Sequence, residues 1–189
     1  MIISLTGFMG CGKSSVGRRL SELLCCPFMD LDQVIEEREG RTIPEIFANE
    51  GEAAFRAMEL DALKEIVVAS EPRQCVPLAP SHSKAAGPSL VVALGGGAVM
   101  TAECAEIVHS DTICIYLRAS VDTLMEHLSC HTDNRPLLNT HGCHSALQDR
   151  ITDLMARRSD TYEKTAHIVI DTDGKSIEAV ASEIISKLA

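Results

Sequence analysis

The chain has 189 residues and a mass of 20.4 kDa, a length typical of one compact domain. Hydrophobic residues make up 46% and charged residues 23%, which excludes a disordered chain, a collagen-like repeat and a coiled coil. Seventeen basic and twenty-seven acidic residues leave a net charge of −10, so we expect no nucleic-acid partner, and an anionic ligand must meet a local cluster of basic groups.

The first ten residues lack the basic start and the apolar length of a secretory signal peptide. No later segment reaches the roughly 18 apolar residues of a membrane span. We therefore expect a cytoplasmic protein without a membrane partner, and we expect it to be a monomer. The eight cysteines lie in apolar periodic segments and none forms Cys-x-x-Cys, so most are expected to be reduced core residues.

Short β-rich runs alternate with longer segments of helical period along the whole chain. Because parallel neighbours need long crossovers that place helices over the sheet, this alternation predicts an α/β fold of three layers around a parallel sheet. The run Leu-Val-Val-Ala-Leu at residues 90–94 is apolar at every position, as in a central strand buried on both faces. The predicted strands are residues 2–6, 27–29, 90–94, 112–117 and 167–170.

Two capping boxes predict helix starts, Thr42-x-x-Glu45 and Ser145-x-x-Gln148. Residues 71–89 hold four of the seven prolines and interrupt both helix and strand patterns. We interpret this segment as a long loop within a single domain of residues 1–189, because neither side forms a complete fold without the other.

The first predicted strand is followed at residues 7–14 by Gly-Phe-Met-Gly-Cys-Gly-Lys-Ser, which matches the phosphate-binding loop Gly-x-x-x-x-Gly-Lys-Ser/Thr. Glycines let successive backbone N–H groups surround phosphate oxygens, the lysine reaches the terminal phosphates, and the serine hydroxyl binds Mg²⁺. The pattern predicts a site for the phosphates of a nucleotide together with Mg²⁺. The predicted nucleotide-binding residues of the loop are Gly7, Gly10, Cys11, Gly12, Lys13, Ser14 and Ser15.

A phosphate-binding loop needs a carboxylate near its metal ion. The strand at residues 90–94 ends in Gly95, Gly96 and Gly97 without an acid, so the candidates are Asp30 and Asp32, after the second strand. Strand periodicity predicts that both carboxylates point into one crevice. Alternatively, one of them only caps a helix that begins near Gln33.

Six motifs in order resemble the shikimate kinases, small members of the P-loop group related to nucleoside-monophosphate kinases. Together they span almost the whole chain. They are GFMGCGKS at 7–14, DLD at 30–32 followed by the helical segment 33–47, AAFRAME at 53–59, LGGG at 94–97, NRPLL at 134–138 and MARRSDTY at 155–162.

The resemblance implies a five-stranded sheet of order 2-3-1-4-5 and ATP-dependent phosphorylation of the 3-hydroxyl of shikimate, a step of aromatic amino-acid biosynthesis. It implies that Asp32 accepts the proton of the attacking hydroxyl and that Asp30 supports Mg²⁺ with Ser14. Arg56 and Arg158 would bind the substrate carboxylate, since a guanidinium matches it bidentately. Gly95, Gly96 and Gly97 would let backbone approach the substrate.

The resemblance further implies a lid at about residues 129–144, from which Arg135 closes over the phosphates as a catalytic and nucleotide-binding residue. The arginine that packs on adenine in most relatives, about seven residues earlier, is missing here, so Arg118 or a histidine is left to supply that contact. A zinc site formed by the Cys and His residues of the lid is a further alternative, although their spacing matches no established pattern.

Each arginine also has a simpler interpretation. Arg56 could pair with Glu59 on a helix surface, Arg135 could be an ordinary loop charge, and Arg157 is expected to be a solvated neighbour of Arg158. The rival functions are another small-molecule kinase, acting on gluconate or a nucleoside monophosphate, and an ATP-gated binding module. The combination of Asp32, Arg56, Arg158 and the three glycines favours the shikimate kinases over another small-molecule kinase. The presence of both Lys13 and Asp32 argues against an inactive binding module.

Overall fold

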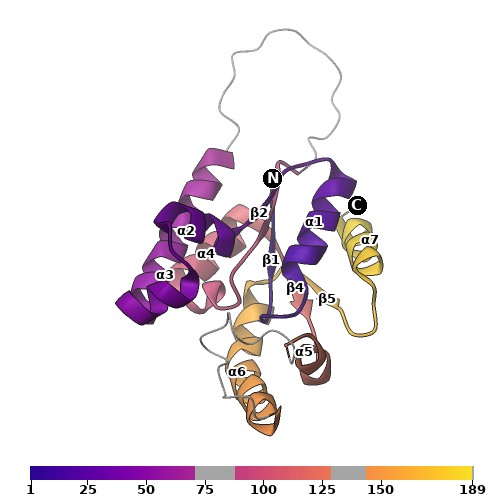
Figure 1. Cartoon of the computed structure of the whole chain (residues 1–189). Helices are drawn as coiled ribbons and strands as arrows, with labels where there is room; N and C mark the ends of the chain where they lie inside the picture. The colour runs from indigo at the N-terminus through magenta and orange to yellow at the C-terminus, as the bar shows by residue number, and fades with distance from the viewer. Residues whose placement is uncertain (71–87, 129–143, 189) are drawn as a thin grey trace.

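The computed structural model describes residues 1–70, 88–128 and 144–188 (Figure 1). Most of the predicted loop 71–89 and of the predicted lid 129–144, including Arg135, lies outside these residues. Within the described part of the chain, no helix combines the length and the apolar character that crossing a membrane requires.

Five parallel strands form one sheet in the order β2-β3-β1-β4-β5, which confirms the expected α/β fold and strand order. The strand boundaries differ from the predicted ones by no more than one residue at either end. The strands are β1 (Ile2–Thr6), β2 (Phe28–Asp30), β3 (Leu90–Ala93), β4 (Thr112–Arg118) and β5 (Ile168–Asp171).

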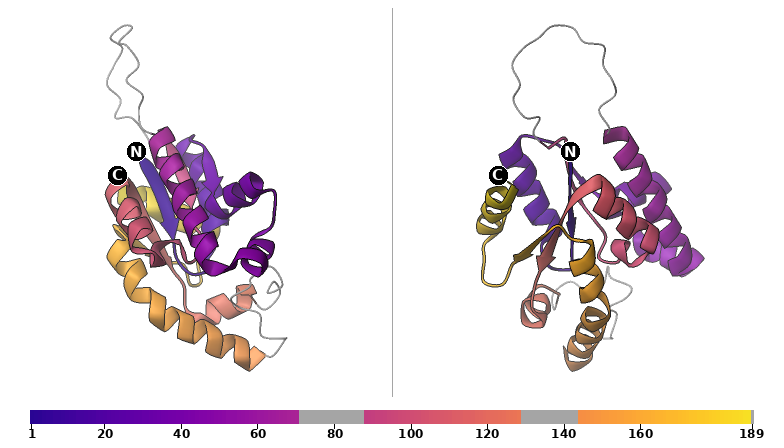
Figure 2. Two further views of the ribbon diagram at one scale, coloured as in Figure 1. Left: turned by 90° about the vertical axis from the view of Figure 1, so that its left-hand side faces the viewer. Right: turned by 180° about the vertical axis from the view of Figure 1, so that it is seen from behind.

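Helices cover both faces of the sheet, so the fold has three layers (Figures 1 and 2). Helices α1 and α7 lie on one face, and α2, α3 and α4 lie on the other. The helices are α1 (Lys13–Leu24), α2 (Leu31–Glu39), α3 (Ile43–Ser70), the 3-10 turn η1 (Ala98–Met100), α4 (Ala102–Asp111), α5 (Val121–Leu128), α6 (His144–Thr165) and α7 (Ile177–Leu188).

The alternation of side chains along the strands divides the core into two parts. Ile3 and Leu5 of β1 belong to the part that includes residues of α1 and α7. Ile2, on the opposite side of the same strand, belongs to the part that includes residues of α2, α3 and α4. Strand β3 is buried at all four positions, as its continuous apolar run predicts for a strand covered on both faces.

The segment 33–47 is divided between two helices rather than forming one. Gly40 ends α2 in the left-handed conformation with φ of 64°, which glycine adopts without steric cost. The capping box predicted at Thr42 then starts α3, because Glu45 Oε2 accepts hydrogen bonds of 2.8 Å from both the amide and the hydroxyl of Thr42. The second predicted helix start, at Ser145, is confirmed to within one residue, since α6 begins at His144.

Of the five described cysteines, Cys11, Cys104 and Cys114 are buried. Burial raises the pKa of the Cys104 thiol to about 11 and that of Cys114 to about 12. These residues therefore act as small apolar core groups, as the sequence predicts.

A pair of histidines joins the start of β5 to β4 and α4. The amide of Cys114 donates to His167 Nδ1 at 3.0 Å, which requires this nitrogen to be unprotonated. The ring of His109 stacks on His167 with centroids 4.6 Å apart. Burial, and secondarily the charge of His109, lowers the pKa of His167 below its ordinary value of 6.5.

We predict that His167→Asn makes stability less sensitive to acid. Because the folded state lowers the pKa of His167, its contribution is complete above the unfolded pKa and is lost as pH falls through the lower folded value. Asn keeps an oxygen acceptor for the Cys114 amide but does not titrate. The free energy of unfolding, measured by denaturant titration between about pH 7.5 and about pH 5, should fall more for the original chain than for the variant. Equal slopes would contradict this account.

Candidate functional site

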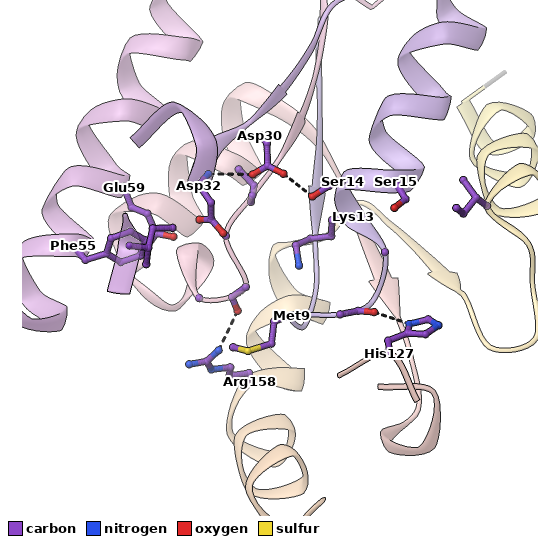
Figure 3. Close-up of a pocket in the computed structure, with 18 of the residues that line it drawn as sticks. Met9, Lys13, Ser14, Ser15, Asp30, Asp32, Phe55, Glu59, His127 and Arg158 are labelled. Carbon is purple, nitrogen blue, oxygen red and sulfur yellow. Dashed lines mark hydrogen bonds between the residues drawn. The ribbon is translucent and has the colours of Figure 1, made fainter. Parts of the chain in front are cut away.

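A cleft of about 940 Å³ opens at the carboxyl edge of the sheet (Figure 3). It is lined by the loop after β1, the end of β2, helices α2 and α3, the turn after β3, and parts of α5 and α6. In open parallel sheets this edge is where ligands bind, because the loops that follow neighbouring strands meet there.

The phosphate-binding loop borders the cleft and leads into α1. Gly10 and Gly12 have φ angles of 86° and 92°, a region that glycine adopts without strain. Lys13 Nζ lies within the loop and donates to the carbonyl oxygens of Gly7 and Phe8 at 3.0 Å. The predicted residues that line the cleft are Gly10, Gly12, Lys13, Ser14 and Ser15.

Gly7 and Cys11, which the motif also includes, are not among the residues that line the cleft. A Cβ atom at Gly7 would lie only 2.6 Å from the carbonyl oxygen of Leu117, so the absence of a side chain lets the loop pass β4. The side chain of Cys11 is buried in the core, 4.0 Å from Lys13 Nζ. These two positions therefore support the loop on the side that faces the core rather than the cleft.

Asp30 and Ser14 bring two oxygen donors together beside the loop. The Ser14 hydroxyl donates to Asp30 Oδ2 at 2.5 Å, and Asp30 Oδ1 accepts from the Asp32 amide at 3.2 Å as the N-cap of α2. The capping alternative is therefore correct for Asp30, which nevertheless also faces the cleft. Mg²⁺ prefers hard oxygen ligands, and a hydroxyl beside a carboxylate fits it.

Asp32 reaches the cleft by a different geometry from the predicted one. Helix α2 begins at Leu31, so Asp32 lies in its first turn and not in an extension of β2. The strand-periodicity argument was wrong in this respect, although both carboxylates line the same cleft. Burial raises the pKa of Asp32 from 3.8 to about 6, and the negative charge of Asp30 adds to this effect.

Arg56 and the buried Glu59 form an ion pair on the wall made by α3. Arg56 Nη1 lies 2.5 Å from Glu59 Oε2, and Nη2 lies 3.0 Å from Glu52 Oε1. The pairing expected from the simpler interpretation is present, but Glu59 is fully buried and both residues line the cleft. Burial raises the pKa of Glu59 to about 7. Within the described residues, its Oε1 atom has no hydrogen-bond partner.

Arg158 enters the cleft from α6 on the side of the glycine turn. Its Nη1 atom donates to the carbonyl oxygen of Gly96 at 3.2 Å, and the hydroxyl of Tyr162 donates to the same oxygen. Arg157, by contrast, is exposed and pairs with Asp153 on the outer surface of α6. The structure thus separates the two adjacent arginines as the sequence predicts.

The three glycines after β3 leave room for the polar groups of the cleft. A Cβ atom at Gly95 would lie 2.5 Å from Glu59 Oε1 and 2.6 Å from Asp32 Oδ1. One at Gly97 would lie 2.4 Å from Arg56 Nη2. Side chains at these positions would therefore displace the carboxylates and the guanidinium.

Glu59 and His127 are among the cleft residues that were not predicted from the sequence. Glu59 lies inside the AAFRAME motif but resembles an ordinary helix-surface partner of Arg56. His127 of α5 lines the cleft and contacts the phosphate-binding loop.

Arg118, expected as a possible contact of adenine, is not among the residues that line the cleft and pairs with Asp171 at 2.5 Å. Among the described residues, no group of three or more His, Cys, Asp or Glu side chains could hold a metal ion.

The cleft thus has a phosphate-binding loop on one side and a buried carboxylate with two arginines on the other. This arrangement, on a parallel sheet of order 2-3-1-4-5, defines a kinase of the P-loop fold. Comparison with known proteins identifies the family. The shikimate kinase family model matches residues 9–76 and 81–189, and the chain belongs to this family.

Individual relatives agree over nearly the full length of both proteins. The shikimate kinase of Thermus thermophilus is 38% identical over 98% of this chain and 89% of its own length. That of Chlorobium phaeobacteroides is 35% identical over 99% and 90%. The structure of shikimate kinase from Acinetobacter baumannii in complex with shikimate superposes with a TM-score of 0.83 at 33% identity, covering 99% of this chain and 92% of that one.

We predict that Asp32→Asn stabilises the protein at neutral and alkaline pH. A carboxyl whose folded pKa is raised stabilises the fold below its unfolded pKa of 3.8 and loses that contribution as pH rises through about 6. The amide has no charge to bury, so the free energy of unfolding should rise by about 1–3 kcal/mol near pH 8. The difference should disappear near pH 4. A variant as stable as the original chain at both pH values would refute the buried-charge explanation.

Proposed function

We propose that this kinase transfers the γ-phosphoryl group of ATP to the 3-hydroxyl of shikimate and forms shikimate 3-phosphate. The observation that carries the proposal is the placement of Asp32, Arg56 and Arg158 in one cleft with the phosphate-binding loop. A small acceptor with a carboxylate and a hydroxyl matches these groups, and the family membership names that acceptor.

On the donor side, the loop amides and the positive end of α1 bind the phosphates of ATP. Lys13 supplies a positive charge to the terminal phosphates. Ser14 and Asp30 would hold Mg²⁺, whose charge would neutralise the phosphate oxygens. Arg135, outside the described residues, remains predicted to add positive charge from the lid.

On the acceptor side, Arg56 and Arg158 bind the carboxylate of shikimate and orient its ring. The 3-hydroxyl oxygen then forms a bond to the γ-phosphorus while the bond between that phosphorus and the ADP oxygen breaks. Asp32 accepts the hydroxyl proton. Its pKa of about 6 suits this role, because the carboxylate is ionised at neutral pH and its pKa lies near the working pH, where general-base catalysis is most effective. Positioning and electrostatics supply most of the acceleration.

The proposal is tested by measuring ADP release from ATP and Mg²⁺ with shikimate, gluconate, nucleoside monophosphates or no acceptor. We expect release that depends on shikimate. Release with another acceptor, or with none, would refute the assigned substrate while leaving the loop assignment intact. We also expect the protein to act as a monomer in the cytoplasm, which sedimentation and cell fractionation would test.

We predict that Asp32→Asn abolishes shikimate-dependent turnover but leaves ATP binding nearly unchanged. The amide keeps the size of the side chain but cannot accept the hydroxyl proton, and general-base catalysis typically contributes about 100- to 10,000-fold. Turnover is measured by ADP release and ATP affinity by calorimetry. Normal turnover in the variant would remove the proposed role of Asp32.

We predict that Arg158→Lys raises KM for shikimate about 10- to 100-fold with a smaller effect on KM for ATP. An ammonium is a point charge and cannot donate two parallel hydrogen bonds to a carboxylate, so it loses a charge-assisted interaction. Arg157→Lys is the matched control, since Arg157 is 70% exposed and lies one position away. An unchanged KM in Arg158→Lys would place the carboxylate elsewhere.

A further inference from the structure

The last turn of α5 contacts Gly10 of the phosphate-binding loop, 117 positions earlier in the chain (Figure 3). His127 Nδ1 lies 2.8 Å from the carbonyl oxygen of Gly10. A carbonyl oxygen only accepts, so the histidine nitrogen is the donor and Nδ1 carries the proton. This bond therefore defines the tautomer of the ring and ties α5 to the loop.

The bond holds one end of a single peptide plane. Because the peptide group is planar and trans, the Gly10 carbonyl and the Cys11 amide point in opposite directions and rotate together. The Cys11 amide donates to the carbonyl oxygen of Phe8 at 3.2 Å and closes the turn at the apex of the loop. His127 thus holds the carbonyl end of the peptide whose amide end closes this turn.

The neighbouring residue of α5 contacts the same glycine through packing. A Cβ atom at Gly10 would lie 2.9 Å from Leu128 Cδ2, so the leucine occupies the space that a side chain would need. Gly10, with φ of 86°, is the kind of residue whose flanking peptides rotate most easily, because it has no Cβ atom to restrict them. Helix α5 therefore restrains the loop at Gly10, a position where the backbone would otherwise rotate easily.

We propose that His127 is a positioning residue of the nucleotide site, which keeps the loop pre-organised for the phosphates of ATP by holding the Gly10 carbonyl. The proposal rests on the proposed binding of ATP at this loop. Loop amides that already have their bound arrangement bind phosphate without the cost of ordering the backbone. The effect belongs to nucleotide binding, since Arg56 and Arg158, assigned to the acceptor, contact other parts of the cleft.

The test compares two substitutions at His127. His127→Phe keeps a planar ring but has no N–H, and it should weaken the binding of ATP with Mg²⁺ about 5- to 10-fold, the effect of one hydrogen bond. In His127→Asn the side-chain amide nitrogen takes the place of Nδ1, so this variant should restore most of the affinity. Asp122→Asn, on the exposed first turn of α5, serves as the control.

Calorimetry without acceptor measures ATP affinity directly, and steady-state kinetics then gives KM for each substrate. We expect KM for ATP to rise in His127→Phe while KM for shikimate stays unchanged. A melting temperature for each variant separates this effect from unfolding, since a purely structural role would lower the melting temperature of His127→Phe and leave the ATP affinity of the folded protein intact.

Undiminished ATP affinity in His127→Phe, or equal weakening in His127→Phe and His127→Asn, would overturn the proposal. If the original chain binds ATP but does not phosphorylate shikimate, the proposed function fails while the role of His127 can still be confirmed by the same calorimetry. If it does not bind ATP at all, both fail.

Discussion

The parallel pairing of β1 with β3, and of β3 with β2, is the constraint on which the site depends. Parallel strands end at the same edge, so the loop after β1, the carboxylates after β2 and the glycine turn after β3 come together there. The crossovers between these strands place helices on both faces, and one of these helices, α3, supplies Arg56 and Glu59 to the cleft. The sheet therefore determines which side chains meet before any of them interacts.

The cleft holds a balance of buried charges that a protein surface would not maintain. Glu59 is buried and Asp32 is half-buried, and loss of solvent raises the pKa of each carboxyl. Nearby positive charges partly offset this effect, those of Lys13 and Arg56 at Asp32 and those of Arg56 and Arg158 at Glu59. Such an arrangement is common at functional sites, because it brings the pKa values of ionisable groups close to neutral pH. The burial of these groups lowers the stability of the fold. Arg56, Arg158 and Lys13 provide the basic groups that an anionic ligand requires on a chain of net charge −10.

Close packing around glycine is the second feature that recurs across the site. Gly95 and Gly97 leave the space that Asp32, Glu59 and Arg56 occupy, and Gly7 and Gly10 let the phosphate-binding loop lie against β4 and α5. In each case a side chain would clash with atoms that line or support the cleft. These glycines therefore connect the fold to the chemistry, since the backbone itself forms part of the wall.

The sequence by itself determined the strands, the phosphate-binding loop, the capping box at Thr42 and the family. Apolar periodicity and local hydrogen-bond motifs depend on residues that are close together in the chain, so they can be recognised without the fold. Only the tertiary structure decided that Asp32 belongs to the first turn of α2, that Glu59 is buried, and that His127 holds Gly10. Glu59 shows the reason most clearly: the same Arg-x-x-Glu spacing forms an ion pair on any helix. Its burial depends on the turn after β3, which is distant in sequence and meets α3 only when the sheet is complete.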